Sequence, residues 1–426
     1  MPSKTKTIRE WKELVLESPA AAARFYFQQI ETIPRDTQRR VFAALPSQDE
    51  LLHSFEEARS HADKPLAGAP YLLKDLYDFP GYPTTASSSF LPEVRPAPSE
   101  EAELSQALRS EGAVFAGKTH LNEFAYGLSG ENRSFGDCPH PVFPDRLSGG
   151  SSSGSAWAVR SGIAPLATGT DTAGSIRVPA AWCGLYGLRF SPNSWSRNGC
   201  FPLAPDFDTA GWMTANSEDM QTAIRALVPL QAAAREKPRG LNLFDAIPNL
   251  SPQFRSRSMD TIRKLDTETQ DDALQAYRKA SAENPFSYAV LQSIDAYQVQ
   301  KDWLDAYRDR YDPVVWQRFD RARHWSEAQI EKASGIEQGI KAFFAACFEA
   351  YDFIVLPATQ SPAIRAAEHT DAFRNELLAI TAPASLARCP VLTVPITLEN
   401  GETLGLQILY RDQFSDLPLR LLEALS

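Results

Sequence analysis

The run of small residues TDTAGS at positions 170–175 ends in a serine whose hydroxyl could act as a nucleophile. The apolar stretch IAPLA before it predicts a buried strand that leads into a tight turn. Such turns expose successive backbone N–H groups, which are the donors that a developing oxyanion needs. The pattern therefore predicts Ser175 as a nucleophile that carries its own oxyanion hole, formed by the backbone amides of Thr172, Ala173, Gly174 and Ser175.

The base that activates this serine is harder to find, because none of the six histidines lies in a recognisable catalytic motif. Lys74 is the remaining candidate, since it directly follows the apolar residues Tyr71-Leu72-Leu73. A lysine with the reference pKa of about 10.4 is protonated at neutral pH, but burial can lower that pKa by as much as ~3–5 units. A solvated charge at a strand end is the alternative interpretation, and the residue pattern alone favours neither.

The tract GGSSSGS at positions 149–155 is a second candidate for chemistry. Close apolar flanks favour a buried turn over a flexible loop. The tract satisfies G-x-S-x-G, with Ser152 as the nucleophile of an α/β-hydrolase, but no strand pattern precedes it at 139–148, where that elbow requires one. A phosphate-binding loop is also disfavoured, because Gly154 is followed by Ser155 and Ala156 rather than by lysine.

Several motifs resemble those of the amidase signature hydrolases, and they run over about 68–216 and 352–409. They comprise the serine-rich stretch Gly149–Arg177, Tyr71–Asp75, Gly81–Ala86, Cys183–Arg189, Phe207–Gly211, Val355–Ala358 and Gly405–Leu409. Within that family, the chain looks most like the short indole-3-acetamide amidases of plants. That likeness rests on Ser129-Gly130-Glu131-Asn132, on the Gly150–Ser155 tract and on the modest length.

The resemblance implies roles for individual residues. Lys74 would be the base, Ser175 the nucleophile, and Ser151, on a cis peptide, the relay that passes a proton between them. Tyr126, Ser129 and Ser151 would contact the substrate. The resemblance implies neither a metal nor a cofactor.

The turn itself departs from the family at one position. Ala173 stands where glycine is common, and a positive φ would strain an alanine there. We expect a negative φ, because the backbone amide acts and the side chain is small. Asp171 and Arg177 are expected to brace the turn through charge-assisted hydrogen bonds.

The implied function is hydrolysis of the C–N bond of a small carboxamide through a serine acyl-enzyme. The acyl group is expected to be aromatic or apolar, on the strength of the subgroup resemblance. Two alternatives stay open. One is an amidotransferase-type subunit that releases ammonia from glutamine, and the other is a non-catalytic binding protein with the amidase fold.

Strands and helices alternate along the chain, which predicts an α/β fold with a central sheet covered by helices on both faces. The resemblance makes that sheet mixed and the whole of 1–426 one amidase domain. Within it we expect N-terminal helices at 1–67, the signature core at 68–216, a helical insert at 285–351 and closing strands with a helix at 352–426.

The helical insert carries an aromatic stripe, with Trp303, Tyr307 and Tyr311 spaced to share one face of a helix. Packing against the sheet is the simpler interpretation of such a face. A lid over an aromatic substrate is the alternative.

Bulk composition excludes several classes of protein. The net charge of −10 argues against nucleic acid or an anionic membrane as the main partner. The five widely spaced cysteines predict free buried thiols rather than a disulfide framework or a zinc site. No apolar run is long enough to span a membrane. We therefore expect a cytoplasmic enzyme that binds a small molecule, and a homodimer stays open as its assembly.

Overall fold

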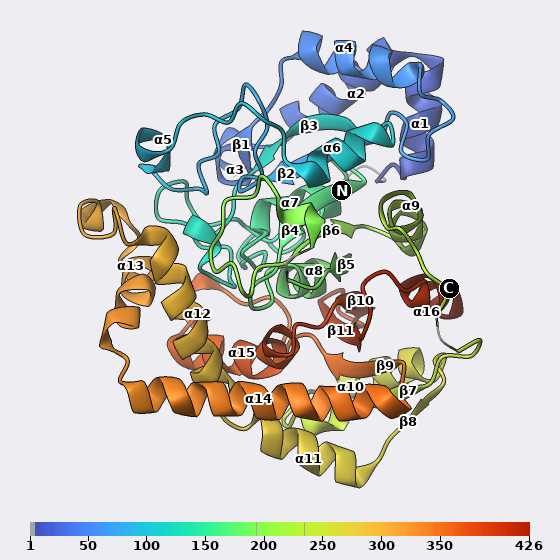
Figure 1. Ribbon diagram of the computed structural model, residues 1–426. Helices are drawn as coiled ribbons and strands as arrows, with labels where there is room; N and C mark the ends of the chain where they lie inside the picture. The colour runs from blue at the N-terminus through green and yellow to red at the C-terminus, as the bar shows by residue number, and fades with distance from the viewer. Residues whose placement is uncertain (1–4, 193, 234) are drawn as a thin grey trace.

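In the part of the chain that the structure describes, the strands form one eleven-stranded sheet, in the order β1-β3-β2-β4-β6-β5-β10-β11-β9-β7-β8. The computed structural model describes residues 5–192, 194–233 and 235–426. The sheet is built from β1 Phe42–Ala44, β2 Pro70–Lys74, β3 Val114–Thr119, β4 Leu166–Thr170, β5 Tyr186–Arg189, β6 Ala210–Thr214, β7 Gly240–Asn242, β8 Thr267–Glu268, β9 Phe353–Pro357, β10 Val391–Thr397 and β11 Thr403–Tyr410. In Figure 1 the strands descend from β3 near the top to β8 at the lower right.

The sheet is mixed, as predicted. β2 pairs in parallel with β3 and β4, and β7 pairs in parallel with β8 and β9. The pairs β1–β3, β4–β6, β6–β5, β5–β10, β10–β11 and β11–β9 are antiparallel. Strands from the first half of the chain therefore join strands from its last quarter through the β5–β10 pair.

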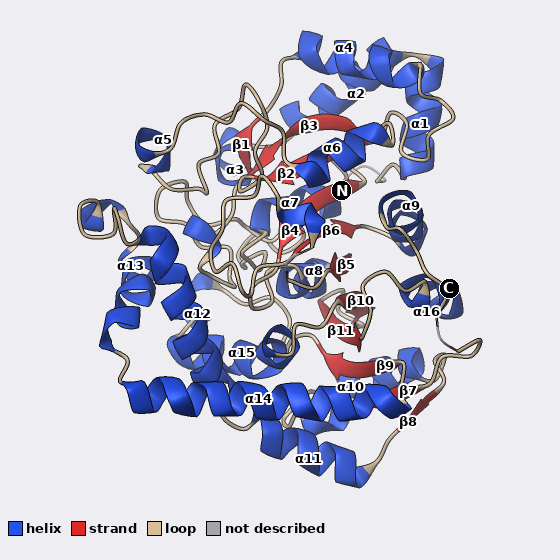
Figure 2. Cartoon of the chain, in the orientation of Figure 1, coloured by secondary structure: helices blue, strands red, loops and turns tan. Residues whose placement is uncertain are grey.

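Helices cover both faces of this sheet (Figure 2). They are α1 Ile8–Glu17, α2 Pro19–Glu31, α3 Arg35–Val41, α4 Gln48–Arg59, α5 Leu91–Val94, α6 Glu103–Ser110, α7 Ser153–Arg160, α8 Arg177–Cys183, α9 Ser217–Leu227, α10 Pro252–Ile262, α11 Asp271–Ser281, α12 Asn284–Gln300, α13 Pro313–Asp320, α14 Glu327–Ala350, α15 Asp371–Leu386 and α16 Leu417–Leu425. The predicted proline at the first position of α2, with Ser18 as N-cap, is present.

Alternating side chains along the strands enter two different cores. Tyr71 and Leu73 of β2 join a core that includes residues of α9 and α16. Leu72, between them, joins the core of α7 and α8 on the opposite face. Because side chains alternate along a strand, Lys74 at the end of β2 lies on the α7 and α8 side.

The segment between the two halves of the sheet is helical, as expected, but the aromatic stripe is not on a helix. α12 ends at Gln300, and Trp303 and Tyr307 lie in turns after it. The buried side chain of Gln300 accepts hydrogen bonds from Trp303 Nε1 at 2.5 Å and from Tyr311 Oη at 2.7 Å. These contacts turn the chain back after α12, so that the helical spacing of the aromatic residues does not produce a helix.

Trp303, Tyr307 and Tyr311 belong to a core that includes sheet residues such as Ile354 and Leu409, and two of these rings also pack on residues outside the sheet. The ring of Tyr307 stacks on Phe90 with centroids 4.6 Å apart, and the ring of Tyr311 lies 4.7 Å from Phe90 and 5.4 Å from Phe124. They therefore fasten the helical insert to loops that surround the end of β2.

All five cysteines are free thiols, as predicted. Cys138, Cys183 and Cys389 are buried, whereas Cys200 and Cys347 are only half-buried, so the expectation of burial was wrong for these two. Among the described residues, the helices are too short or too polar to traverse a bilayer.

Candidate active site

Lys74 ends β2 with its side chain fully enclosed by protein. Its Nζ lies 2.8 Å from Ser151 Oγ, 3.0 Å from Ser152 Oγ and 2.7 Å from Thr170 Oγ1. The part of the chain that the structure describes places no carboxylate within ion-pair distance of this amine. Lys74 is thus a buried lysine whose partners are hydroxyl groups, and the alternative of a solvated surface charge is wrong.

Burial lowers the pKa of Lys74 from its ordinary value to about 7, against the opposing effect of more distant negative groups that include Asp171 and Asp208. Desolvation penalises the charged form of an amine, and hydroxyl oxygens compensate less than a carboxylate would. A large fraction of the amine is therefore neutral at neutral pH. A neutral amine can accept a proton, which an ordinary lysine cannot.

Ser151 follows a cis peptide bond between Gly150 and Ser151. The tight packing around this bond needs glycine, because a Cβ at Gly150 would lie 2.0 Å from Asn122 Oδ1. Ser151 is completely buried, and its carbonyl accepts a hydrogen bond from Asn122 N at 3.2 Å. The serine-rich tract is a buried turn at the start of α7, not a flexible loop.

Ser175 lies in the turn between β4 and α8 and is 2% exposed. Its carbonyl accepts a hydrogen bond from Ser152 N at 3.2 Å, which joins the turn to the serine-rich loop. The backbone amides of residues 172–175 donate no hydrogen bond to any described part of the chain. Buried amides without acceptors are rare in folded proteins, so these donors are available to a ligand.

The conformation of the turn agrees with the expectation for Ala173. Gly174 has φ +154°, whereas Ala173 is absent from the residues with positive φ. A Cβ at Gly174 would also lie 3.1 Å from Thr381 of α15, which covers the turn. Glycine is therefore needed at 174 and not at 173.

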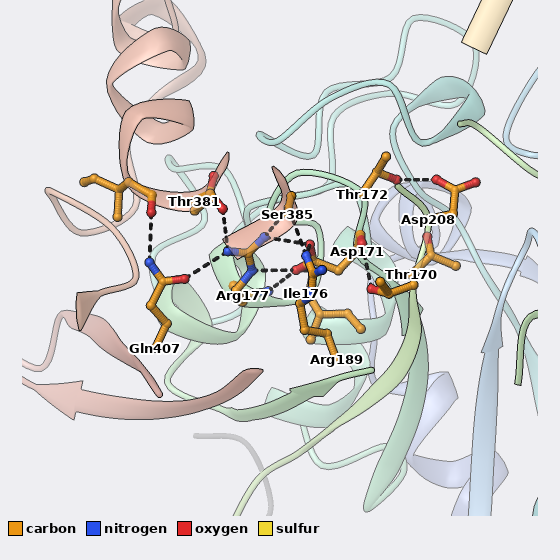
Figure 3. A network of polar contacts seen from close by, with 12 residues as sticks. Thr170, Asp171, Thr172, Ile176, Arg177, Arg189, Asp208, Thr381, Ser385 and Gln407 are labelled. Carbon is orange, nitrogen blue, oxygen red and sulfur yellow. Dashed lines mark hydrogen bonds and ion pairs between the residues drawn. The ribbon is translucent and has the colours of Figure 1, made fainter. Parts of the chain in front are cut away.

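A buried ion-pair network lies beneath the turn (Figure 3). Asp171 accepts hydrogen bonds from Arg177 Nη2 and Arg189 Nη1, each at 2.9 Å, and from Ile176 N at 3.1 Å. Thr381, Ser385 and Gln407 reach the arginines from the C-terminal half of the chain. Asp171 and Arg177 brace the turn as predicted.

Beside the serine-rich loop, a cavity of about 260 Å³ is lined by residues that include Tyr126, Ser129 and Arg318. Ser129 Oγ donates to Glu131 Oε2 at 2.7 Å, and Tyr126 Oη donates to the carbonyl of Arg318 at 3.1 Å. Gly150 N donates to the carbonyl of Leu128 at 2.8 Å. The predicted substrate loop thus lies against the cis peptide, although neither Tyr126 nor Ser129 forms a hydrogen bond with Lys74 or Ser175.

Sequence reasoning missed several partners of these residues. Ser152 and Thr170 both contact Lys74, yet Ser152 was considered as the nucleophile of an α/β-hydrolase and not as a partner of this lysine. The neighbouring Asp75 pairs with the buried Lys118, with Nζ and Oδ1 2.7 Å apart. Thr172 Oγ1 donates to Asp208 Oδ1 at 2.7 Å. All of these residues except Lys118 lie within the motifs that carry the family resemblance, but the motifs do not specify these contacts.

The arrangement provides a neutral amine, two buried serines and a set of unpaired amides in one place. Such groups can move a proton and stabilise negative charge on oxygen, which are the requirements of acyl transfer. Within the described residues, no three histidine, cysteine or carboxylate side chains are grouped as metal ligands would be.

Comparison with known proteins agrees with this chemistry. The family model described as Amidase matches residues 21–258 and 255–413, which is most of the chain.

Curated relatives align along nearly the full length. A glutamyl-tRNA(Gln) amidotransferase subunit from Halalkalibacterium halodurans is 30% identical, with 90% of this chain and 88% of that protein covered. AtzE, a 1-carboxybiuret hydrolase subunit from Pseudomonas sp. (strain ADP), is also 30% identical, with 89% of this chain and 91% of that protein covered.

Solved structures superpose equally well. A structure described as an amidase gives a TM-score of 0.82 at 26% identity, with 99% of both chains covered. A chain of a vestigial protein complex, connected with the origins of an s-triazine catabolic enzyme, gives a TM-score of 0.83 at 26% identity and covers 99% of this chain and 98% of its own.

Proposed function

The chain belongs to the amidase family and is an amidase, and from that premise we propose that it hydrolyses a small carboxamide through an acyl-enzyme on Ser175. The observation that carries the proposal is the Nζ of Lys74, buried and 2.8 Å from Ser151 Oγ with a pKa of about 7. A neutral amine at this place can act as the general base that serine needs.

The reaction begins when Ser175 Oγ attacks the amide carbon. Its proton passes to Ser151 Oγ, and the proton of Ser151 passes to Lys74 Nζ. Negative charge collects on the former carbonyl oxygen, and the unpaired backbone amides of Thr172, Ala173, Gly174 and Ser175 donate to it. Because these donors are held by the turn before the reaction, they need no reorganisation as charge develops.

The tetrahedral intermediate collapses when the proton returns through Ser151 to the leaving nitrogen. The C–N bond breaks, ammonia or an amine departs, and the acyl group stays on Ser175 Oγ as an ester. A water molecule then attacks the ester and gives its proton to the same relay. The carboxylic acid leaves and Ser175 Oγ regains its proton. Tyr126 and Ser129 are placed in this scheme as substrate contacts at the cavity beside the loop.

Three variants test the nucleophile. Ser175→Ala should lower the amidase rate by ~10⁴-fold or more, because the members of such a unit cannot replace one another. Ser152→Ala should keep measurable turnover, since the Ser152 hydroxyl accepts from Lys74 and donates to the carbonyl of Thr170 but has no place in the proposed proton relay. Ser155→Ala is the matched control, because its buried Oγ contacts Thr119 rather than Lys74. Released acid is measured for each, with circular dichroism to check folding.

A Ser175→Ala enzyme with full activity would refute the proposal, and an inactive Ser152→Ala enzyme beside an active Ser175→Ala enzyme would transfer the role to Ser152. The substrate panel includes primary amides, anilides, acylated amino acids and indole-3-acetamide, whose cleavage would support the subgroup resemblance.

An amidotransferase-type subunit is the second candidate function, since relatives at 28% to 30% identity carry that name over most of this chain. Strict dependence of activity on a second protein and on glutamine would favour it. Amide hydrolysis by the purified chain alone favours the amidase proposal.

A further inference from the structure

Two arginine side chains bind Tyr126, which lines the cavity beside the serine-rich loop, and a third arginine lies on the neighbouring helix α15. Arg318 of α13 donates from Nη1 to the carbonyl of Tyr126. Arg321 donates from Nη2 to Tyr126 Oη at 3.1 Å. Arg374 of α15 is the third, and its pKa is lowered by burial and by the charges of Arg318 and Arg321. Arg318, Arg321 and Arg374 thus lie close enough for their charges to act on one another, although carboxylates such as Asp371 also line the cavity.

Arg374 stands out because it has no partner. Arg374 is 6% exposed, and its buried Nε has no hydrogen-bond acceptor. The described residues offer it neither an ion pair nor a side-chain hydrogen bond. Burying an uncompensated charge is strongly unfavourable. The first turn of α15 makes this worse, since the N-terminal end of a helix repels cations. A contribution to the stability of the fold therefore does not explain why a buried arginine is present at position 374.

The position of Arg374 on α15 points toward the proposed reaction centre. Thr370 and Asp371, one turn before it, line the 260 Å³ cavity together with Tyr126 and Arg318. Thr381, two turns after it, packs against Gly174 in the oxyanion turn. Residues seven apart share a face of a helix and lie about 10 Å apart along its axis. Arg374 therefore lies on α15 between the residues that line the cavity and the residue that covers the oxyanion turn, on the same face as Thr381.

Tyr288 of α12 supports this placement. The charges of Arg374 and Asp208 are both close enough to act on its hydroxyl. Its ring packs edge-on against Phe207, with centroids 5.6 Å apart, and Asp208 holds Thr172 of the oxyanion turn. Tyr288 is therefore connected to the turn through Phe207 and Asp208, and Arg374 lies near its hydroxyl.

We propose that the substrate carries a carboxylate, which Arg374 binds with the help of Arg318 and Arg321 while the amide lies at Ser175. This inference rests on the proposed amidase function and replaces the expected aromatic or apolar acyl group. A guanidinium group binds a carboxylate through two parallel hydrogen bonds, and the pair is strongest where water is excluded. The substrate class is therefore the monoamide of a short dicarboxylic acid.

Paired substrates that differ only in charge test the assignment. Glutaramate and pentanamide have the same chain and the same amide, but only glutaramate has a terminal carboxylate. The wild-type enzyme should prefer glutaramate in kcat/KM. Arg374→Met should lower kcat/KM for glutaramate by about 30-fold or more, since removing one member of a buried charge pair costs at least about 2 kcal/mol. It should change kcat/KM for pentanamide by less than about 3-fold. Arg365→Met, at an exposed ion pair, is the matched control.

A binding measurement separates this inference from the proposed function. In Ser175→Ala enzyme, which keeps all three arginines, glutarate should raise the melting temperature, and the added change Arg374→Met should abolish that rise. Without ligand, Arg374→Met should itself keep or raise the melting temperature, because it removes an unpaired buried charge. A structural arginine would do the opposite.

Three results would overturn the assignment: equal preference for glutaramate and pentanamide in the wild type, parallel loss of both substrates in Arg374→Met, or an Arg374→Met enzyme that is less stable and still responds to glutarate. Loss of all amide hydrolysis with intact glutarate binding would instead refute the catalytic proposal and leave the anion site standing.

Discussion

Three hydroxyl oxygens, instead of water, surround the amine of Lys74 in the folded protein. This environment allows the amine to act as a base. Ser151, Ser152 and Thr170 solvate the amine without adding negative charge. A carboxylate at the same distance would hold the amine protonated and remove its capacity as a base. The contrast with Lys118 is direct, because Lys118 is equally buried but pairs with Asp75. Of these two buried lysines, only Lys74 is suited to accept a proton.

The lowered pKa of Lys74 gives a prediction about pH. The acylation rate should rise as pH increases through about 7 and then level off, because only the deprotonated amine accepts the proton of Ser151. Single-turnover kinetics on the wild type measure this profile, and Lys74→Met should remove acylation. An acylation rate that stays constant or falls as pH passes 7 would exclude Lys74 as the base.

At the scale of elements, the turn between β4 and α8 depends on charge buried beneath it. Burial opposes ionisation of Asp171, but Arg177 and Arg189 outweigh that effect and hold its pKa below the ordinary value. The carboxylate also accepts from Ile176 N and Arg177 N at the start of α8. One side chain therefore fixes both ends of the segment that carries the oxyanion donors.

Removing this carboxylate should destabilise the fold. Asp171→Ala should lower the free energy of unfolding by about 3–5 kcal/mol, because it leaves two buried guanidinium groups without their shared partner. Urea denaturation measures the loss. Asp36→Ala is the matched control, since its ion pairs with Arg39 and Arg40 are exposed and screened by solvent, so that their loss should change the free energy of unfolding far less. Equal stability of the Asp171→Ala and Asp36→Ala proteins would contradict this account of the turn.

Sequence analysis succeeded where structure is local. Apolar strand patterns followed by a lysine or by a run of small residues located Lys74 and the 170–175 turn. A serine followed by a proline located the start of α2. It failed for the aromatic stripe, because the contacts of Gln300 end α12 before Trp303. Helical spacing carries no information about such a buried amide.

At the scale of the whole molecule, the site depends on pairs that no local pattern contains. Arg177 donates to Gln407, 230 residues later in the chain. The partners of Tyr126 lie in α13 and just after it, and Arg374 is on α15, which carried no motif. The proposed negative charge of the acyl group consequently could not be predicted from the sequence. Organisation of 1–426 as one domain, and formation of a homodimer, stay predictions.

The central claim is that Ser175 carries the acyl group in a chain that acts alone. The most direct test is to quench the purified protein during turnover of glutaramate or another cleaved amide and map the modified peptide by mass spectrometry. The account predicts one acyl adduct, on Ser175, without any second protein. Turnover with the adduct on Ser152, or with Ser175 unmodified while another residue accumulates the acyl group, would contradict it.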